Sequence, residues 1–344
     1  MDTPEINVPE MNVPESIDLK PIRKIYSRFG WSLCVIFIVA TLLQGTIGAV
    51  VQTFWPDGCW LTESSYGVWL VTFVPMYLVA IPAGLLVIKN LPTAAPDSHK
   101  MGTKNFWIFM AVAFFLTYAG SFAGSMLSSL LSGGNAENAL DAYAMDSNPI
   151  KILFLAVLAP LIEEYVFRKQ LIDRTRIYGE KAAVFFSALT FGLFHTNLFQ
   201  FFYAFLVGWI FAFVYIRTGK LRYCVLMHSI INFMGSVIAP MILSMLDLEA
   251  LSNIDPNASE EDLMALYGSM LPGLMLYLLL LLFIVVVSII GLILLVTKWK
   301  KLRWCKAPEE LPAKMLNKAT YLNAGMIVFL ILFGAMTVLS VVLQ

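Results

Sequence analysis

Apolar runs of membrane-spanning length constrain this sequence more than any other feature. A helix that crosses the hydrocarbon core of a bilayer needs about 20 mostly apolar residues, and a series of stretches reaches or approaches this length. Their approximate limits are 30–54, 66–88, 106–131, 150–172, 182–196, 198–216, 223–246, 271–297 and 320–343. The chain is 59% hydrophobic and 13% charged, whereas a soluble domain has about 25% charged residues. The sequence therefore predicts an all-α, polytopic transmembrane helical bundle with about eight or nine spans.

The fifth and sixth runs are short and almost contiguous. We expect them to form a tight hairpin whose tip is His195, Thr196 and Asn197. The first 28 residues are rich in Pro and Glu, a composition typical of disordered segments. We therefore divide the chain into a disordered cytoplasmic tail at 1–28 and a single membrane domain at 29–344, with its chemistry concentrated at about 150–240.

Lys and Arg are segregated to alternate loops. Every basic residue except Lys151 falls in the tail, or in or at the border of the loops that follow the second, fourth, sixth and eighth runs, and the opposite loops are acidic. Because basic loops stay on the cytoplasmic side, the amino terminus is predicted to be cytoplasmic and the carboxyl terminus outside. The net charge is zero, so no basic surface indicates a nucleic-acid partner. The four scattered cysteines indicate neither disulfides nor a thiolate metal site.

Three polar motifs lie inside consecutive apolar runs. They are Glu163-Glu164 with Arg168, Phe191 with His195, and His228 with Asn232. Ionisable side chains at membrane depth are costly and usually face the interior of a bundle, where they have a function.

Helical rise and periodicity predict how these groups are arranged. At about 1.5 Å per residue, all of them fall in the middle of the bilayer, in one cavity reached most easily from the cytoplasm. Residues four apart share a helix face, so Glu164 pairs with Arg168 while Glu163 points elsewhere, towards the cavity. Each group taken singly could be a structural polar pair between helices. Two glutamates, two histidines and an asparagine in neighbouring helices favour a catalytic site.

The chemistry that this set supports is attack by water on a carbonyl. A glutamate with a histidine can deprotonate water, and a second histidine with an asparagine amide can stabilise an oxyanion. Two histidines and a carboxylate, here His195, His228 and Glu163, could equally hold a zinc ion that leaves one position open for water. Both versions stay open at this point.

The ordered motifs Glu-Glu-x-x-x-Arg, Phe-x-x-x-His and His-x-x-x-Asn resemble the CPBP family of intramembrane proteases. That family includes the CAAX prenyl endopeptidases and the bacterial Abi and bacteriocin-processing proteins. The resemblance covers about residues 150–240 and includes Gly208 and the Thr218-Gly219 turn.

The resemblance implies a role for each residue of the motifs. Glu163 would be the catalytic carboxylate and would act with His195 on the water, and His228 and Asn232 would stabilise the oxyanion. The supporting residues would be Glu164, Arg168 and Phe191. The implied enzyme is a glutamate-type or metallo-type hydrolase that cleaves a membrane-associated peptide or protein, prenylated in the best-known members.

Two other functions are weighed against the protease. A non-catalytic membrane immunity or scaffolding protein could retain the same site in order to bind a peptide partner. A cation-coupled transporter could use the midplane carboxylates, but such proteins often show internal repeats and none is visible here. The acidic outer loops and the absence of eukaryotic features favour a bacterial plasma membrane, in which the protein contacts lipid along its spans.

Overall fold

The computed structural model describes residues 17–254 and 259–343, and this part of the chain contains only helices and loops. Short π turns and 3₁₀ turns, labelled η, interrupt several of the helices. The elements in chain order are α1 (Lys20–Phe54), α2 (Trp60–Glu63), α3 (Ser65–Pro75), η1 (Met76–Ala80), α4 (Ile81–Ile88), α5 (Thr103–Ser132), α6 (Ala139–Met145), η2 (Ile152–Leu158), α7 (Ala159–Glu164), η3 (Tyr165–Gln170), α8 (Leu171–Thr175), η4 (Arg176–Tyr178), α9 (Glu180–Phe194), α10 (Leu198–Thr218), α11 (Leu221–Phe233), η5 (Met234–Ile238), α12 (Ala239–Leu243), α13 (Leu248–Ser252), α14 (Glu260–Lys298), η6 (Trp299–Lys301), α15 (Ala313–Tyr321) and α16 (Ala324–Val342).

The predicted polytopic helical bundle is confirmed. Among the described residues, seven helices are long and apolar enough to cross a membrane: Lys20–Phe54, Ser65–Ile88, Thr103–Ser132, Leu198–Thr218, Leu221–Leu243, Glu260–Lys298 and Ala324–Val342. Two further predicted spans are helical but fall outside that set. The helix over 152–175 carries the charges of the Glu-Glu-x-x-x-Arg motif, and α9 has only 15 residues, which is about 22 Å.

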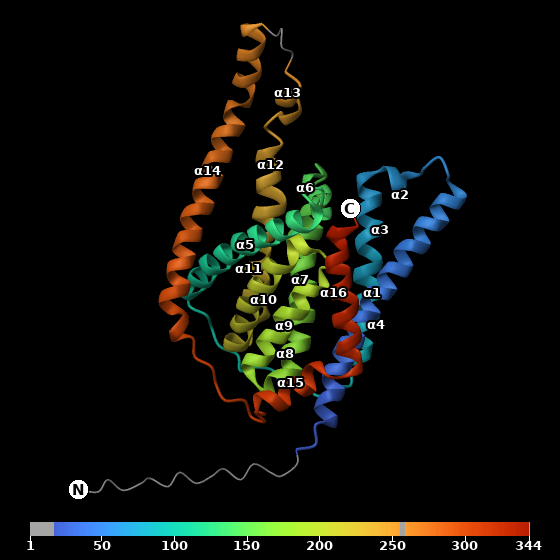
Figure 1. Cartoon of the computed structure of the whole chain (residues 1–344), viewed down its shortest axis with the longest axis vertical. Helices are drawn as coiled ribbons and strands as arrows, with labels where there is room; N and C mark the ends of the chain where they lie inside the picture. The colour runs from blue at the N-terminus through green and yellow to red at the C-terminus, as the bar shows by residue number, and fades with distance from the viewer. Residues whose placement is uncertain (1–16, 255–258, 344) are drawn as a thin grey trace, which may run out of the picture.

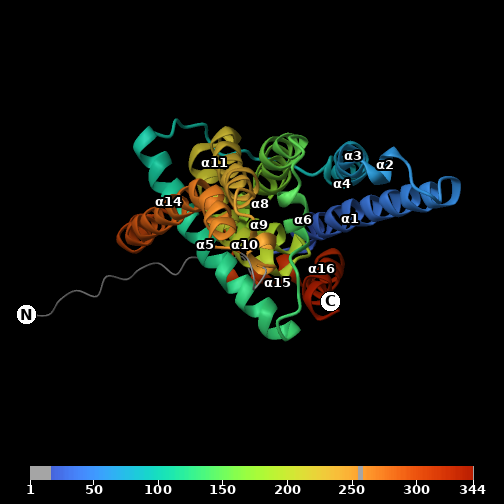
Figure 2. The ribbon, with the colours of Figure 1, turned by 90° about the horizontal axis from the view of Figure 1, so that it is seen from above.

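The helices that carry the polar motifs lie at the centre of the bundle. α10 packs against both α5 and α9, and α11 packs against η2 and α7. α14 lies on the outer side of α5, while α1 contacts α4 and α16 at the other side of the molecule, as Figures 1 and 2 show. At 39 residues, α14 is about 58 Å long and extends past the rest of the bundle (Figure 1).

The amino-terminal boundary differs from the prediction. α1 begins at Lys20 with Pro21 in its first turn, so residues 20–28, which were expected to be disordered, are helical. The reason is an apolar stripe at helical spacing, Ile22, Ile25, Tyr26 and Phe29, which is buried against the bundle. The rest of the predicted tail, residues 1–16, lies outside the described residues.

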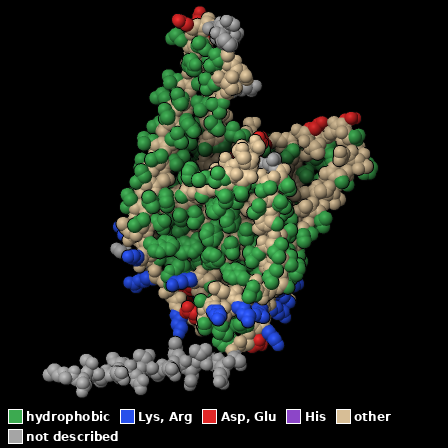
Figure 3. Space-filling view, in the orientation of Figure 1, with side chains coloured by type: hydrophobic (Ala, Val, Ile, Leu, Met, Phe, Trp, Pro, Cys, Tyr) green, Lys and Arg blue, Asp and Glu red, His purple; other side chains and the backbone are tan. Residues whose placement is uncertain are grey.

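Charge is segregated along the molecule as the sequence predicts. Lys and Arg side chains gather at one end of the visible face, and acidic side chains gather at the opposite tips (Figure 3). Lys151, the exception in the sequence, is buried and its Nζ donates to the carbonyl of Ala144 at 2.8 Å. This distribution supports the predicted orientation, with the basic end in the cytoplasm.

Prolines widen three of the helices near the chemistry-bearing residues. The π turns η1, η2 and η5 each end two residues before a proline, at Pro82, Pro160 and Pro240. A proline inside a helix has no N–H and its ring clashes with the carbonyl four residues earlier. A local widening to i→i+5 hydrogen bonding accommodates the ring, and such π turns are frequent at functional sites.

Small residues on α5 allow α10 to approach closely. A Cβ atom on Gly120 would lie 2.5 Å from the Cα of Tyr203, and one on Gly124 would lie 2.7 Å from the carbonyl oxygen of Phe199. Glycines four apart permit this kind of contact between membrane helices. The contact fixes α10, which in turn packs against the helix that ends at His195.

Candidate active site

Glu164 and Arg168 form the ion pair expected from their spacing. Both side chains are completely buried, and Arg168 Nε lies 2.9 Å from Glu164 Oε2. Arg168 also donates to Glu164 Oε1 at 3.2 Å and to the Ser187 hydroxyl on α9 at 2.9 Å. Ser187 in turn donates to the carbonyl of Phe167 at 2.8 Å. The pair therefore joins the motif helix to α9 without contact with solvent.

His228 bridges the two carboxylates. Its Nδ1 lies 3.0 Å from Glu164 Oε1, and its Nε2 lies 3.8 Å from Glu163 Oε2. The Glu163 side chain keeps 24% exposure, whereas Glu164 has none. The predicted division of the two glutamates is thus observed: one is enclosed with Arg168, and the other points to a different, more accessible side.

His195 is held by the turn that ends α9. Its Nδ1 is 2.8 Å from the carbonyl oxygen of Phe191, and because a carbonyl only accepts, Nδ1 carries the proton and Nε2 keeps a lone pair. Glu163 and His228 both lie close enough to act electrostatically on His195. In this geometry His195 can accept a proton or a hydrogen bond at Nε2.

The predicted hairpin tip depends on an unusual residue. Thr196 has φ +48°, a left-handed conformation that is unfavourable for a β-branched residue. Asn197 follows it and caps α10, because its Oδ1 accepts from the N–H of Phe199 at 3.0 Å. Asn197 Nδ2 also donates to Asn138, next to α6, at 2.8 Å. Strain of this kind is kept only where the surroundings hold it.

Phe191 lies between the basic groups of the site. Its ring meets His195 edge-to-face at 4.9 Å and His228 at 5.8 Å, and the Arg168 guanidinium lies over it at 4.6 Å. A Cβ atom on Gly208 would lie 2.9 Å from this ring. Gly208 therefore lets α10 close the site behind Phe191, which lines it as expected.

Asn232 has a structural contact that the sequence did not indicate. Its Nδ2 donates to the carbonyl of Leu155 in η2 at 2.9 Å. The N–H of Ala159 bonds to Phe154, and the next residue, Pro160, has no N–H to offer to Leu155. The Asn232 amide thus supplies the donor that Pro160 lacks, and it retains a second N–H for other partners.

Sequence reasoning missed three residues of the site. The Ser187 hydroxyl accepts a hydrogen bond from Arg168. Tyr77 and Tyr203 both lie close enough to Glu163 to interact with it electrostatically. The Tyr77 hydroxyl is buried and has no hydrogen-bond partner within the described part of the chain. Tyr77 lies within the proline-associated turn η1, which is the one signal that could have singled it out.

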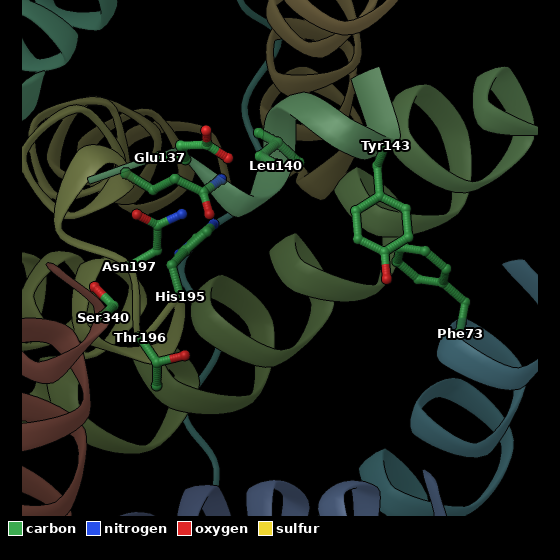
Figure 4. Close-up of a pocket in the computed structure, with 9 residues that line it drawn as sticks. Phe73, Glu137, Leu140, Tyr143, His195, Thr196, Asn197 and Ser340 are labelled. Atoms are coloured by element: carbon green, nitrogen blue, oxygen red, sulfur yellow. The ribbon is translucent and has the colours of Figure 1, made fainter. Parts of the chain in front are cut away.

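A cavity of about 270 Å³ adjoins His195 (Figure 4). Its walls include Thr196 and Asn197 from the hairpin tip and Leu140 and Tyr143 from α6. α6 belongs to an acidic loop that is predicted to lie outside. This cavity therefore reaches His195 from the side opposite to the cytoplasmic approach that the sequence suggested, because α9 is short and its tip lies under α6.

The zinc ligands expected from the sequence are His195, His228 and Glu163. Among the residues that the structure describes, no group of three or more His, Cys, Asp or Glu side chains is arranged to hold a metal ion. Nε2 of His228 and Oε2 of Glu163 are 3.8 Å apart, which is only a little wider than the separation of two ligands that each lie about 2.0–2.2 Å from a tetrahedral zinc ion. The zinc version stays a prediction.

Comparison with known proteins places this site in a family. Residues 146–234 match the family model described as type II CAAX prenyl endopeptidase Rce1-like. The membrane-embedded CAAX protease MroQ of Staphylococcus aureus (strain USA300) is 26% identical over 205 residues, which are 55% of this chain and 80% of MroQ. The putative membrane peptidase YdiL of Bacillus subtilis (strain 168) is 26% identical over 176 residues, which are 48% of this chain and 69% of YdiL. No solved structure matches the chain.

These matches, together with the helical bundle and the three motifs, indicate a multi-pass membrane peptidase. The segment that carries the motifs is similar to the type II CAAX prenyl endopeptidase Rce1-like family. The matched segment coincides closely with the region that carries the motifs.

Proposed function

We propose that this protein is an intramembrane endopeptidase that hydrolyses a peptide bond of a membrane-associated or lipidated substrate with water activated by Glu163 and His195. The observation that carries the proposal is the unequal placement of the two glutamates. Glu164 is enclosed with Arg168, whereas Glu163 stays partly accessible, beside His228 and within electrostatic reach of His195. A buried ion pair orients the site, and the accessible carboxylate is available for proton transfer.

The proposed reaction follows from this placement. A water molecule between Glu163 and His195 Nε2 gives a proton to the Glu163 carboxylate while its oxygen bonds to the carbonyl carbon. The carbonyl oxygen becomes an oxyanion in the tetrahedral intermediate. The C–N bond then breaks, and the proton on Glu163 passes to the departing amine. The immediate products are a carboxylic acid and an amine, which exchange a proton to become a carboxylate and an ammonium ion, and Glu163 returns to its ionised form.

His228 is the proposed donor to the oxyanion. Its Nδ1 donates to Glu164, so Nε2 can donate as well only when the ring is an imidazolium. In that form two carboxylates, one guanidinium and one imidazolium give the cluster no net charge, as a buried site requires. Asn232, through its second N–H, and the buried Tyr77 hydroxyl are further proposed donors. Donors placed before the reaction stabilise developing charge without reorganisation.

The substrate class is a proposal that rests on similarity to known proteins. The matched family model is described as type II CAAX prenyl endopeptidase Rce1-like, and MroQ is named as a CAAX protease. We propose a peptide or protein substrate in the membrane. Whether lipidation is required is tested below by pairing farnesylated peptides with unmodified ones.

The deciding experiment is cleavage of a peptide library by the purified, detergent-solubilised protein and its Glu163→Gln variant. We expect a loss of at least about 10³-fold in kcat with an unchanged melting temperature, since general acid–base catalysis contributes about 10²–10⁴-fold. Glu261→Gln, on the exposed part of α14, is the matched control. Cleavage by Glu163→Gln at the rate of the control would refute the proposal, and a cellular function that survives the substitution would favour the binding-protein alternative.

The same assay tests zinc. Metal content is measured on the purified protein, and cleavage is measured with and without a chelator. Activation of water by Glu163 and His195 without a metal predicts that cleavage resists the chelator. Loss of cleavage on chelation, restored by added zinc, would replace it with the metal version.

A further inference from the structure

The cavity next to His195 has two chemically different ends. Figure 4 shows Glu137, His195 and Asn197 on one side and the rings of Phe73 and Tyr143 together on the other. The lining residues come from α3, α6 and its preceding loop, the hairpin tip, α10 and α16. Segments this far apart in the sequence converge at one point, directly beside a residue of the proposed catalytic set.

The cavity is built in advance by contacts at both ends of α6. Before α6, Asn138 accepts from Asn197 of the hairpin tip at 2.8 Å. After α6, Asp146 accepts from Trp69 Nε1 at 2.7 Å and from the Ser65 hydroxyl, both on α3. α6 therefore cannot move away from His195 without breaking hydrogen bonds to two different helices. A preformed cavity of this kind favours ligand binding because little ordering is needed.

The Asp146 contact is strong enough to alter the acidity of that side chain. Burial alone would raise the pKa of Asp146, but hydrogen bonds from Ser65, the Asn148 N–H and Trp69, with the nearby Lys151, lower it below its usual value. Asp146 is thus ionised at neutral pH and accepts all of these bonds.

The polar end of the cavity favours a cation. Glu137 is the only Asp or Glu among the described lining residues, and no Lys or Arg lines the cavity. Asp141 stands one helical turn away on α6, and its carboxyl accepts from Asn138 at 3.0 Å. A positively charged side chain entering here would meet one sign of charge only, and such a cleft attracts the opposite charge.

The other end favours an apolar side chain. The Phe73 ring stacks on Trp69 at 5.2 Å and on Phe154 at 5.0 Å, and Tyr143 meets Phe73 edge-on at 6.0 Å. These rings are held by one another, so they present a rigid aromatic wall. Cavities with aromatic walls and a few fixed polar groups are typical of ligand sites.

We propose that this cavity is the subsite that selects the substrate: a peptide segment approaching from the acidic end places a basic side chain at Glu137 and an apolar side chain against the wall formed by Phe73 and Tyr143. The inference rests on the proposed peptidase function, and it adds the chemistry and the side of entry of the substrate. The scissile bond then lies beyond the cavity, on the side of His195 that faces the rest of the proposed catalytic set.

The first test is a charge swap. In a set of peptides, each position in turn is occupied by Lys, Gln or Glu while the other positions stay the same. The set is assayed with the wild-type protein, Glu137→Gln, Glu137→Lys and the control Glu261→Gln. At one position we expect the wild type to prefer Lys over Glu by about tenfold or more in kcat/KM, Glu137→Gln to reduce that preference, and Glu137→Lys to reverse it. A Lys/Glu ratio that stays within twofold in Glu137→Lys overturns the inference.

Failure of the subsite inference can be distinguished from failure of the proposed peptidase function. If Glu163→Gln abolishes cleavage while Glu137→Lys leaves the preference intact, the peptidase stands and the subsite does not. A catalysis-independent test covers the remaining case, in which no peptide is cleaved. Ser340→Cys is placed in a chain whose four native cysteines are replaced, and intact cells are treated with a membrane-impermeant maleimide.

We expect labelling of Ser340→Cys from outside the cell and protection by a basic–apolar peptide. Protection by an acidic peptide of the same length should be much weaker. Labelling that requires access from the cytoplasm, or equal protection by both peptides, overturns the inference. This measurement does not depend on whether the protein cleaves the probe.

Discussion

The buried cluster of Glu164, Arg168 and His228 and the hairpin tip of His195, Thr196 and Asn197 hold the same proposed site in different ways. In the cluster, buried polar side chains bond to one another, and the spacing within one helix sets the main ion pair, Glu164 with Arg168. At the tip, the backbone turns through a left-handed residue, and neighbouring segments hold it there. The comparison teaches that charge balance secures one half of the site, whereas contacts between distant segments secure the other.

The largest effect is expected in the cluster. Arg168→Met should lower stability by about 3–5 kcal/mol, because it leaves the Glu164 carboxylate buried without its partner. The measurement is thermal unfolding in detergent, followed by size-exclusion chromatography. Glu164→Leu with Arg168→Met should recover most of the stability and none of the activity, since replacing a whole buried pair by apolar residues is often neutral. If the single variant unfolds at the wild-type temperature, the cluster is not the part secured by charge.

A smaller effect is expected at the tip. Asn197→Ala removes the cap of α10 and the bond to Asn138, and the loss of a cap costs about 1 kcal/mol. Because His195 depends on this turn, we expect kcat to fall about tenfold while the melting temperature falls only by a few degrees. Asn323→Ala, which removes the equivalent cap from α16, is the control and should affect stability alone. Equal loss of kcat in both variants would contradict the role given to the tip.

The smallest effect is expected for Asn232, whose side chain replaces the backbone N–H that Pro160 lacks. Asn232→Ala should destabilise the protein by about 1 kcal/mol, a typical size for an interhelical hydrogen bond in a membrane. In a Pro160→Ala background, where residue 160 regains its N–H, the same substitution should cost measurably less. A double-mutant cycle on unfolding free energies gives the coupling. Zero coupling would mean that Asn232 and Pro160 act independently.

Much of the site could be predicted from local rules. Glu164 and Arg168 share a helix face because residues four apart always do, and the structure shows them paired. The tight turn at His195 also follows from two short runs with no room for a loop. α1 shows where the prediction was wrong: its first turns looked like part of a polar tail, and they are helical because their few apolar residues share one buried stripe.

Local sequence patterns are sufficient to predict the helical class, the membrane setting, the segregation of charge and the polar residues that enter the bundle, because hydropathy and helical period are properties of short segments. Three features follow only from how the helices pack: Asn232 bonds to Leu155, Tyr77 lies within electrostatic reach of Glu163, and a cavity under α6 reaches His195. The physical reason is that distances between helices depend on how side chains from remote segments pack together. No local pattern records that packing.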